Sequence, residues 1–344
     1  MNWDKVARNW LIAVATLLFV ISSGCVISPR ISPGGGGTPT PSPTPGTGGQ
    51  LYVASGNSIF RFSNAEAANG DSTPAATITS TRLQNPQRML VDTRNDRLFV
   101  ANSGSILIYD NASTKTGSVA PDRAISGNNT GLSNPTDLAL DTNSDQLYVA
   151  DGVLISVFAN ASTMNGNPAP ARSFSLGVGA DAILLDTTHD QLLVADTADN
   201  VVNVLGQASI QNVIAQPTAL IAGPDTKLSG PAGLALDGNN RLIVSNSANP
   251  VSISVYPNAA IANGDVLTVA LLSGGNTNLT APEQIILDQN TNNGELYVVD
   301  SASGSILIFS NMSTANNNQA PARVITSTSL PVNSINGIAL DTTR

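Results

Sequence analysis

Cysteine and histidine are almost missing from this chain of 344 residues, which has one of each, Cys25 and His189. A single thiol cannot form a disulfide within the chain. A single imidazole excludes metal sites that need two or three histidines. Any Ser-His-Asp triad would have to use His189, because the chain has no other histidine.

Aromatic and charged side chains are also scarce, at 4% and 11% of the residues. Both tryptophans, Trp3 and Trp10, lie at the very start, so the rest of the chain offers no large ring faces for stacking sugars or bases. The net charge is −9 and the pI about 4.4. Such a surface repels phosphate backbones, and without a basic stripe we expect no nucleic-acid partner.

Residues 1–24 have the parts of an export signal. Lys5 and Arg8 precede an apolar run from Leu11 to Ile21, although Asp4 offsets one of the two positive charges. This run is too short to cross roughly 30 Å of hydrocarbon as a helix. We therefore predict a cleaved signal peptide.

The small residues Ser22-Ser23-Gly24 before Cys25 resemble the lipobox of bacterial lipoproteins, although Ser22 stands where that family most often has leucine. The resemblance implies cleavage after Gly24 and acylation of Cys25 with chains such as palmitate. More than one acyl chain gives stable anchoring, since each buried methylene contributes about 0.8 kcal/mol. The alternative is an ordinary signal peptide whose removal leaves a free thiol.

The segment 25–50 is dominated by glycine, proline, serine and threonine, and has almost nothing apolar to bury. It is typical of a tether that holds a folded body away from a membrane. Val26 follows the cysteine, and by analogy with the lipoprotein family the absence of Asp there favours the outer membrane or cell surface of a Gram-negative cell. We thus expect an exported, lipid-anchored protein.

From residue 51 onward the sequence repeats itself every 45 to 54 residues. One element recurs as LYVAS at Leu51, LFVAN at Leu98, LYVAD at Leu147, LLVAD at Leu192, LIVSN at Leu242 and LYVVD at Leu296. A second element precedes it and ends in an aspartate: Asp92, Asp141, Asp186, Asp237, Asp288 and Asp341. A third and a fourth apolar run follow, such as SILIY and RAISG. Four short β-type runs per repeat are typical of a propeller blade.

The ends of the repeat region predict how the ring closes. The body begins at the second strand type, at Leu51, and the chain stops just after a first-type strand, INGIALD, at Arg344. The C-terminal strand can therefore complete the blade that LYVAS begins, which removes an open sheet edge. We predict an all-β fold over 51–344, a six-bladed propeller with four-stranded blades, and we expect a monomer.

Stretches such as NPTDLALDTNSDQLYVAD and GPAGLALDGNNRLIVSN resemble NHL-type repeats over residues 51–344. The proline of that theme recurs at Pro86, Pro135, Pro231 and Pro282, and is replaced by Ala180 and Ile335. The resemblance implies a six-bladed ring and roles that are mostly binding, although a fold does not fix a function.

Two sets of residues are candidates for chemistry. The aspartates that end the first strand of each repeat are best explained as turn residues that accept backbone N–H bonds. Five residues before each, at the expected channel mouth, stand Gln87, Thr136, Asp181, Ala232, Glu283 and Asn336. Enzymes of the gluconolactonase and senescence-marker family, which this ring resembles, hold a divalent metal at such a mouth. By that resemblance Asp181, Glu283 and Asn336 are weak candidate ligands for calcium or magnesium.

Two further features have plain explanations. His189 lies in the turn DTTHDQ, where an exposed surface histidine is expected rather than a catalytic base. The triplets that begin at Asn111 and Asn311 match a glycosylation pattern, but we expect their Asn and Ser side chains to stabilise loops.

The sequence favours a non-enzymatic binding scaffold, with a protein or small-molecule ligand at a ring face or the central channel and no cofactor. A metal-dependent hydrolase or lactonase and a structural envelope protein remain as alternatives.

Overall fold

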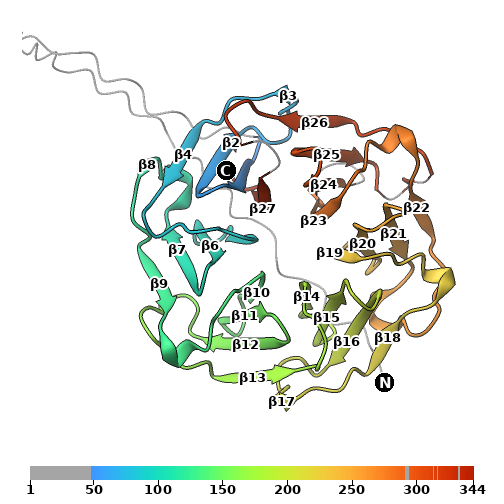
Figure 1. The fold of residues 1–344 in the computed structure, drawn as a ribbon, viewed down its shortest axis with the longest axis horizontal. Helices are drawn as coiled ribbons and strands as arrows, with labels where there is room; N and C mark the ends of the chain where they lie inside the picture. Colours follow the sequence, from blue (N-terminus) through green and yellow to red (C-terminus); the bar gives the residue numbers. More distant parts are fainter. Residues whose placement is uncertain (1–47, 291–293, 313, 316, 332–333) are drawn as a thin grey trace, which may run out of the picture. The chain divides into compact units, whose positions relative to one another are not determined.

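The four apolar runs of each repeat form four neighbouring antiparallel strands, and six such sheets form a ring (Figure 1). The structure is a computed structural model and describes residues 48–344 except 291–293, 313, 316 and 332–333. The predicted signal peptide, the lipidation site Cys25 and most of the tether lie outside the described residues. The predicted six-bladed β-propeller is confirmed.

Each blade contributes one strand to each of four concentric layers. The innermost strands, from blade 1 to blade 6, are β27 (Ile335–Asp341), β5 (Met89–Asp92), β10 (Asp137–Asp141), β14 (Ala182–Asp186), β19 (Pro231–Leu236) and β23 (Pro282–Asp288). The second layer is β1 (Gln50–Ser55), β6 (Arg97–Asn102), β11 (Gln146–Asp151), β15 (Gln191–Asp196), β20 (Leu242–Asn246) and β24 (Glu295–Asp300).

The third-layer strands have five or six residues, and the fourth-layer strands only three or four. The third layer is β2 (Ser58–Ser63), β7 (Ser105–Asp110), β12 (Leu154–Ala159), β16 (Val201–Gly206), β21 (Ser252–Tyr256) and β25 (Ser305–Ser310). The fourth is β4 (Ala76–Thr79), β9 (Arg123–Ser126), β13 (Arg172–Ser175), β18 (Ala219–Ile221), β22 (Ala270–Leu272) and β26 (Arg323–Thr326). The described helices are single 3-10 turns: η1 (Ala112–Thr114), η2 (Asn128–Thr130), η3 (Pro224–Thr226), η4 (Ala259–Ile261) and η5 (Gly275–Thr277). No helix of the described part is long and apolar enough to cross a membrane.

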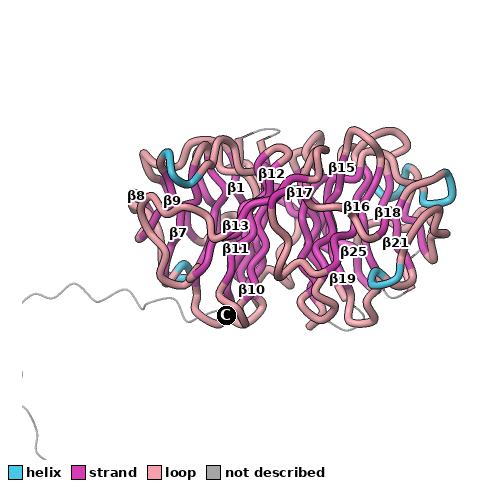
Figure 2. The backbone as a smooth tube through the Cα atoms, turned by 90° about the horizontal axis from the view of Figure 1, so that it is seen from below, coloured by secondary structure: helices cyan, strands magenta, loops and turns pink. Residues whose placement is uncertain are grey.

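The C-terminal strand closes the ring as predicted. β27 pairs antiparallel with β1, with Leu51 opposite Leu340 and Val53 opposite Ile338. Blade 1 therefore has the order β27-β1-β2-β4, in which its innermost strand comes from the other end of the chain. Seen edge-on, the strands run between the two faces of the ring (Figure 2).

Burial is deepest in the second and third layers rather than in the first two. β1 and β24 are buried along almost their whole length, and so are β7 and β21. The innermost strands keep half-buried residues, as in β10, because one of their edges faces the axis of the ring.

Six apolar clusters hold the blades together, one at each junction between neighbouring blades. Between blades 1 and 2, for example, Tyr52 and Ile59 of one blade pack with Leu98 and Val100 of the next. Between blades 6 and 1, Tyr297 and Ile306 pack with Leu51 and Val53, as at every other junction. The closing junction is thus as well packed as the five junctions within the continuous chain.

A second connection runs round the outer rim and was not predicted. The loop between the third and fourth strands of each blade reaches back and pairs in parallel with the outermost strand of the preceding blade. Three of these contacts form two-residue strands, β3 (Gly70–Asp71), β8 (Gly117–Ser118) and β17 (Val213–Ile214). The others are the single bridges Ile125–Gly166, Ile221–Gly264 and Leu272–Asn317. Together they cover all six outer edges, where sheets otherwise invite pairing with other chains.

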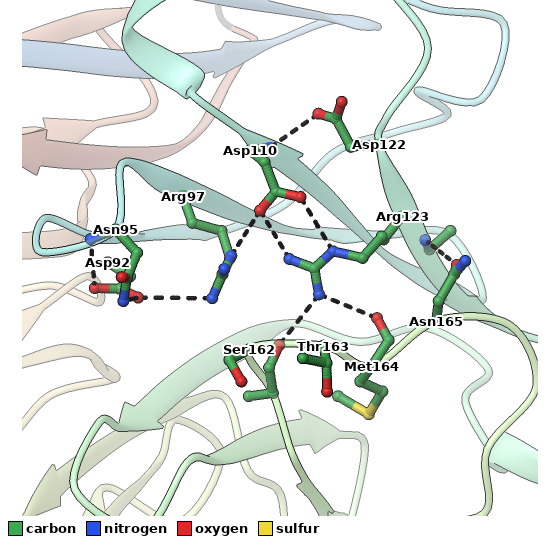
Figure 3. A network of polar contacts seen from close by, with 12 residues as sticks. Asp92, Asn95, Arg97, Asp110, Asp122, Arg123, Ser162, Thr163, Met164 and Asn165 are labelled. Carbon is green, nitrogen blue, oxygen red and sulfur yellow. Dashed lines mark hydrogen bonds and ion pairs between the residues drawn. The ribbon is translucent and has the colours of Figure 1, made fainter.

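Arginine side chains reinforce this rim in three blades. In Figure 3, Asp110 accepts hydrogen bonds from Arg97 at 2.7 Å and from Arg123 at 2.8 Å. Arg123 then donates to the carbonyl oxygen of Met164, in the loop of the next blade, at 3.2 Å. Arg172 and Arg323 make equivalent bonds from blades 3 and 6.

Candidate functional site

The axis of the ring contains a cavity that all six innermost strands line. It has a volume of about 250 Å³. Apolar side chains form most of its wall, among them Leu90, Leu184, Leu234, Ile286 and Leu340. Its polar lining residues are Arg88, Asp137 and Gln284. Each of the three stands four residues before the aspartate that ends the innermost strand of its blade, so they share one level of the ring.

This polar level closes the cavity toward the face where the innermost strands begin, here called the starting face. Arg88 forms an ion pair with Asp137 at 2.9 Å, and both side chains are about nine-tenths buried. Arg88 also donates to the carbonyl oxygen of Ala232 in blade 5, across the ring from its own blade 2. Asp137 additionally accepts the N–H of Ile183 at 2.9 Å. One buried ion pair thus connects blades 2, 3, 4 and 5.

Two glycines allow this level to be so narrow. A Cβ atom on Gly337 would lie 2.7 Å from Cα of Arg88, and one on Gly233 would lie 2.3 Å from the carbonyl oxygen of Glu283. Any larger residue would therefore push neighbouring innermost strands apart. The positions equivalent to Arg88 and Asp137 in blades 5 and 1 are glycines because the ring has no further room there.

Hydrogen bonds cross all six blade junctions near the starting face. Five of them join Asn336 to Pro86 O (2.9 Å), Thr136 to Ala180 O (3.4 Å), Thr197 to Pro231 O (2.8 Å), Ser245 to Glu283 O, and Ile338 N to Gln284 (2.7 Å). The Arg88–Asp137 ion pair spans the remaining junction, between blades 2 and 3. The starting face is therefore tied together by polar contacts, whereas the rest of the channel wall is apolar.

Below the polar level, large and small side chains alternate from blade to blade. Two residues before the strand-ending aspartates stand, from blade 1 to blade 6, Ala339, Leu90, Ala139, Leu184, Ala235 and Ile286. One residue later every blade has a half-buried valine or leucine: Leu340, Val91, Leu140, Leu185, Leu236 and Leu287. Three alanines leave space that six large side chains would fill, which explains a hollow axis.

A second pocket of about 400 Å³ adjoins the axial cavity and shares Leu90, Leu138 and Leu184 with it. Its lining extends to Thr93, Arg94 and Thr142, in the turns that join the first and second strands of blades 2 and 3. We call this side of the ring the turn face. Most of the residues that line the two hollows are apolar, with the buried ion pair at one end and the polar groups of Asp92, Thr93, Arg94 and Thr142 at the other.

The three predicted metal ligands each have a local partner. The carboxylate of Asp181 accepts the N–H of Thr197 at 2.9 Å, and that of Glu283 accepts the hydroxyl of Ser301 at 2.7 Å. The side-chain amide of Asn336 donates to Pro86 O, so its nitrogen faces blade 2. Within the described residues, no three His, Cys, Asp or Glu side chains gather in a way that could hold a metal ion. The metal site remains a prediction.

The other three residues of that predicted ring have structural contacts. Gln87 donates weakly to Asn85 O at 3.4 Å, Thr136 bridges blades 3 and 4, and Ala232 is buried with its carbonyl oxygen bonded to Arg88.

The prediction for the strand-ending aspartates is confirmed. In every blade the carboxylate accepts an N–H of the following turn, at distances from 2.9 to 3.3 Å: Asp92 from Asn95, Asp141 from Asn143, Asp186 from Thr188, Asp237 from Asn239, Asp288 from Asn290 and Asp341 from Thr343. These carboxylates stabilise the turns.

His189 lies in a turn with 42% of its side chain exposed, and its Nδ1 atom is 2.7 Å from Asp186. This agrees with the predicted surface position. Asn111 has a left-handed backbone, and Ser113 of the same triplet donates to Asp96 at 2.6 Å, so this triplet stabilises the loop as expected.

The sequence reasoning missed Arg88, Asp137 and Gln284, which lie one position after the ring it selected. A signal for them was present, because Arg88 and Asp137 are charged residues at the start of otherwise apolar strands. Aligning the repeats at that position would have shown opposite charges in neighbouring blades.

Comparisons with known proteins support the fold. No protein-family profile and no curated protein sequence matches the chain. Among solved structures, a chain of a nidogen/laminin complex is similar at 14% identity and a TM-score of 0.58, covering 86% of this chain and 98% of that one. A Bacteroides caccae protein of unknown function has 10% identity and a TM-score of 0.59, covering 85% and 98%. At such identities the likeness shows the six-bladed fold alone.

Proposed function

We propose that this protein is a non-catalytic binding module outside the cytoplasm, anchored through Cys25, that takes an aliphatic ligand into its axial cavity. The observation that carries the proposal is the lining of the cavity. Residues of all six blades line it, most of them are apolar, and its charged residues are paired with each other at one end.

The size and polarity of the cavity support this ligand class. Small-molecule sites are typically mostly apolar hollows of roughly 300–1,000 Å³ with a few fixed polar groups. The pocket of about 400 Å³ on the turn face falls in this range, and the axial cavity of about 250 Å³ extends it. The ring of half-buried leucines favours a slender aliphatic chain. Thr93, Arg94 and Thr142 offer hydrogen bonds to a polar end group at the turn face.

The predicted anchor supports a place outside the cytoplasm. The sequence combines an export signal, a lipobox-like segment at Cys25 and a polar tether in front of a closed propeller. A protein held at a membrane surface in this way meets aliphatic molecules that leave or enter the bilayer. The rigid ring would then present one sheltered apolar site to them.

Titration with an apolar fluorescent probe tests the proposal. The propeller (residues 48–344) is titrated with N-phenyl-1-naphthylamine, and we expect saturable binding of one probe per chain. Leu184 lines both hollows, so Leu184→Trp places a bulky indole ring in them and should weaken probe binding at least tenfold. The matched control is Leu154→Trp, the same change at a leucine on the surface, which should leave binding unchanged.

Binding that never saturates, or that Leu184→Trp and Leu154→Trp affect equally, would show that the probe attaches to the surface and not to the axis. Either result contradicts the proposed site.

A further inference from the structure

Exposed aliphatic side chains gather on one sector of the outer rim. Among the described residues, nine large apolar side chains are exposed, and seven of them lie in two equivalent stretches of blades 4 and 5, each of which runs from the loop after the third strand through the fourth strand. These stretches are 207–223 and 258–274, here called the aliphatic sector. The seven residues expose 40–78% of their surface: Ile210, Val213, Ile214, Leu220, Ile261, Leu267 and Val269.

The other four blades provide an internal control for this sector. All six loops between the third and fourth strands have the same length, and each pairs with the outermost strand of the preceding blade, so their positions correspond one to one. Where blade 4 has Ile210, blades 2 and 3 have Thr114 and Thr163. The loop itself therefore does not need an aliphatic residue at that position.

At the position of Ile214, blades 3 and 5 have side chains that accept a hydrogen bond. At the equivalent position Asn167 accepts the N–H of Asn129 at 2.9 Å, and Asp265 accepts the N–H of Asp225 at 2.7 Å. Isoleucine cannot accept a hydrogen bond, and Ile214 is 70% exposed. Blade 4 therefore lacks this hydrogen bond and exposes an aliphatic side chain in its place.

Val213 is strained in the same loop. Its φ is +64°, in the left-handed region, where four of the five other blades have glycine and the fifth has Asn317. A β-branched residue in this conformation is a genuine outlier that costs of order 1–3 kcal/mol. Val213 is also 69% exposed, so burial in this chain does not compensate for the strain. Contact with another molecule would bury Val213 and so offset the cost of its strained backbone.

The two stretches lie side by side. The N–H of Gly264 donates to Leu220 O at 2.6 Å, and Asn263 accepts the N–H of Leu220. In Figure 1, β17, β18 and β22 follow one another round the rim, at the outer edges of blades 3, 4 and 5. The exposed aliphatic residues therefore lie on adjoining segments of the rim.

Charge is almost missing from this sector. Stretch 207–223 has no charged residue, and stretch 258–274 has one, Asp265. At its border lie Asp225 and Lys227, both about half exposed. In a chain of net charge −9, a sector with a single charged residue is where two copies can approach with little repulsion.

In place of the monomer expected from the sequence, we propose that the aliphatic sector is the contact between two copies of this chain. A twofold contact brings the same surface of each copy together. The two stretches contain 34 residues, of which 28 are not buried, and this number lies within the 20–30 residues that one side of a stable interface contributes. A lipid surface fits less well, because the sector has neither the basic residues nor the aromatic rings of interfacial membrane binders.

Site-directed cross-linking of the full-length chain in the producing cells tests this inference. Ile261→Cys is treated with a bismaleimide reagent, and we expect a product of twice the monomer mass. The matched control is Thr114→Cys, the equivalent position of the opposite blade, which should give at least tenfold less product. Since Cys25 is present in both variants, any reaction of its thiol contributes equally to both.

An exchange of loop residues between blades separates loss of the contact from loss of the fold. Ile210→Thr, Val213→Gly and Ile214→Asn give blade 4 the residues that blade 3 already has at these positions. In the Ile261→Cys background we expect this exchange to reduce the dimer product at least tenfold while the melting temperature stays equal or rises. Equal products from Ile261→Cys and Thr114→Cys, no dimer product, or products of another mass from a different partner would each overturn the inference.

Discussion

At the scale of single residues, Arg123 shows how one side chain connects neighbouring blades. Its guanidinium binds the carboxylate of Asp110 in its own blade and the carbonyl oxygens of Ala161 and Met164 in the next. The hydrogen bond from Arg123, together with that from Arg97, holds the pKa of the Asp110 carboxyl below its usual range. The ionised form of Asp110 is thus the form that the fold favours.

This makes part of the stability depend on pH. The folded-state pKa of Asp110 is lower than the unfolded value of about 3.9, so its contribution is present above about pH 4 and is lost as the pH falls through the folded value. We expect the melting temperature to fall between pH 5 and pH 3, and to fall less in Asp110→Asn. Asp199→Asn, an exposed control, should follow the wild type. Thermal unfolding at both pH values measures this, and identical slopes in all three proteins would contradict it.

The candidate metal ligands allow a direct test at the same scale. Because Asp181, Glu283 and Asn336 each bond to a separate local partner, we expect calorimetry with calcium or magnesium to show no stoichiometric heat. Tight one-to-one binding that Asp181→Ala abolishes would reverse this expectation and favour the metal-dependent hydrolase.

At the scale of strands, the apolar periodicity of the sequence predicted where the strands lie, and the number of copies of each strand type predicted how the ring closes. The six copies of each strand type implied that INGIALD pairs with LYVAS, and β27 does pair with β1. The outer-rim contacts could not be predicted, because pairs such as Gly117–Ser118 carry no strand pattern and depend on the preceding blade. The ion pair Arg88–Asp137 was missed although its charges stand out in the sequence, because the repeats were compared one position before the level at which these side chains meet.

The closing strand gives the sharpest test of topology. Removal of residues 335–344 exposes the edge of β1 and deletes Ile335, Ile338 and Leu340 from the junction of blades 6 and 1. We expect loss of cooperative thermal unfolding, followed by circular dichroism, together with aggregation through the open edge.

A permuted chain is the control for that deletion. Placing residues 335–344 directly before Gly48 makes β27 and β1 a continuous hairpin, as the first two strands are in the other five blades. The permuted chain should recover the melting temperature of the wild type to within about 5 °C. If the truncated chain unfolds like the wild type, or if the permuted chain does not recover, the closure described here is wrong.

At the scale of the whole molecule, the ring is a rigid support with two distinct surfaces of interest. The starting face is tied by polar contacts at every junction, so it favours rigidity. The turn face opens into the apolar cavity, and the aliphatic sector lies apart from both on the rim. A ligand in the cavity and a second copy at the rim can therefore be bound at the same time.

The predicted anchor concerns the whole molecule as well. We expect the full-length protein to be in the membrane fraction, and intact-mass analysis of the mature chain to show acyl groups added at Cys25. Cys25→Ser should abolish the added mass. A mature wild-type chain without acyl mass would end the lipoprotein proposal but would leave the propeller and its cavity unaffected.

Crystals of the propeller under xenon pressure test the central claim, a hollow apolar axis, most directly. Xenon enters apolar cavities that water does not fill. The account predicts xenon peaks on the axis beside Leu90, Leu184 and Ile286, and their loss in Leu184→Trp. A chain of ordered waters along the axis, with no xenon there in the wild type, would contradict it.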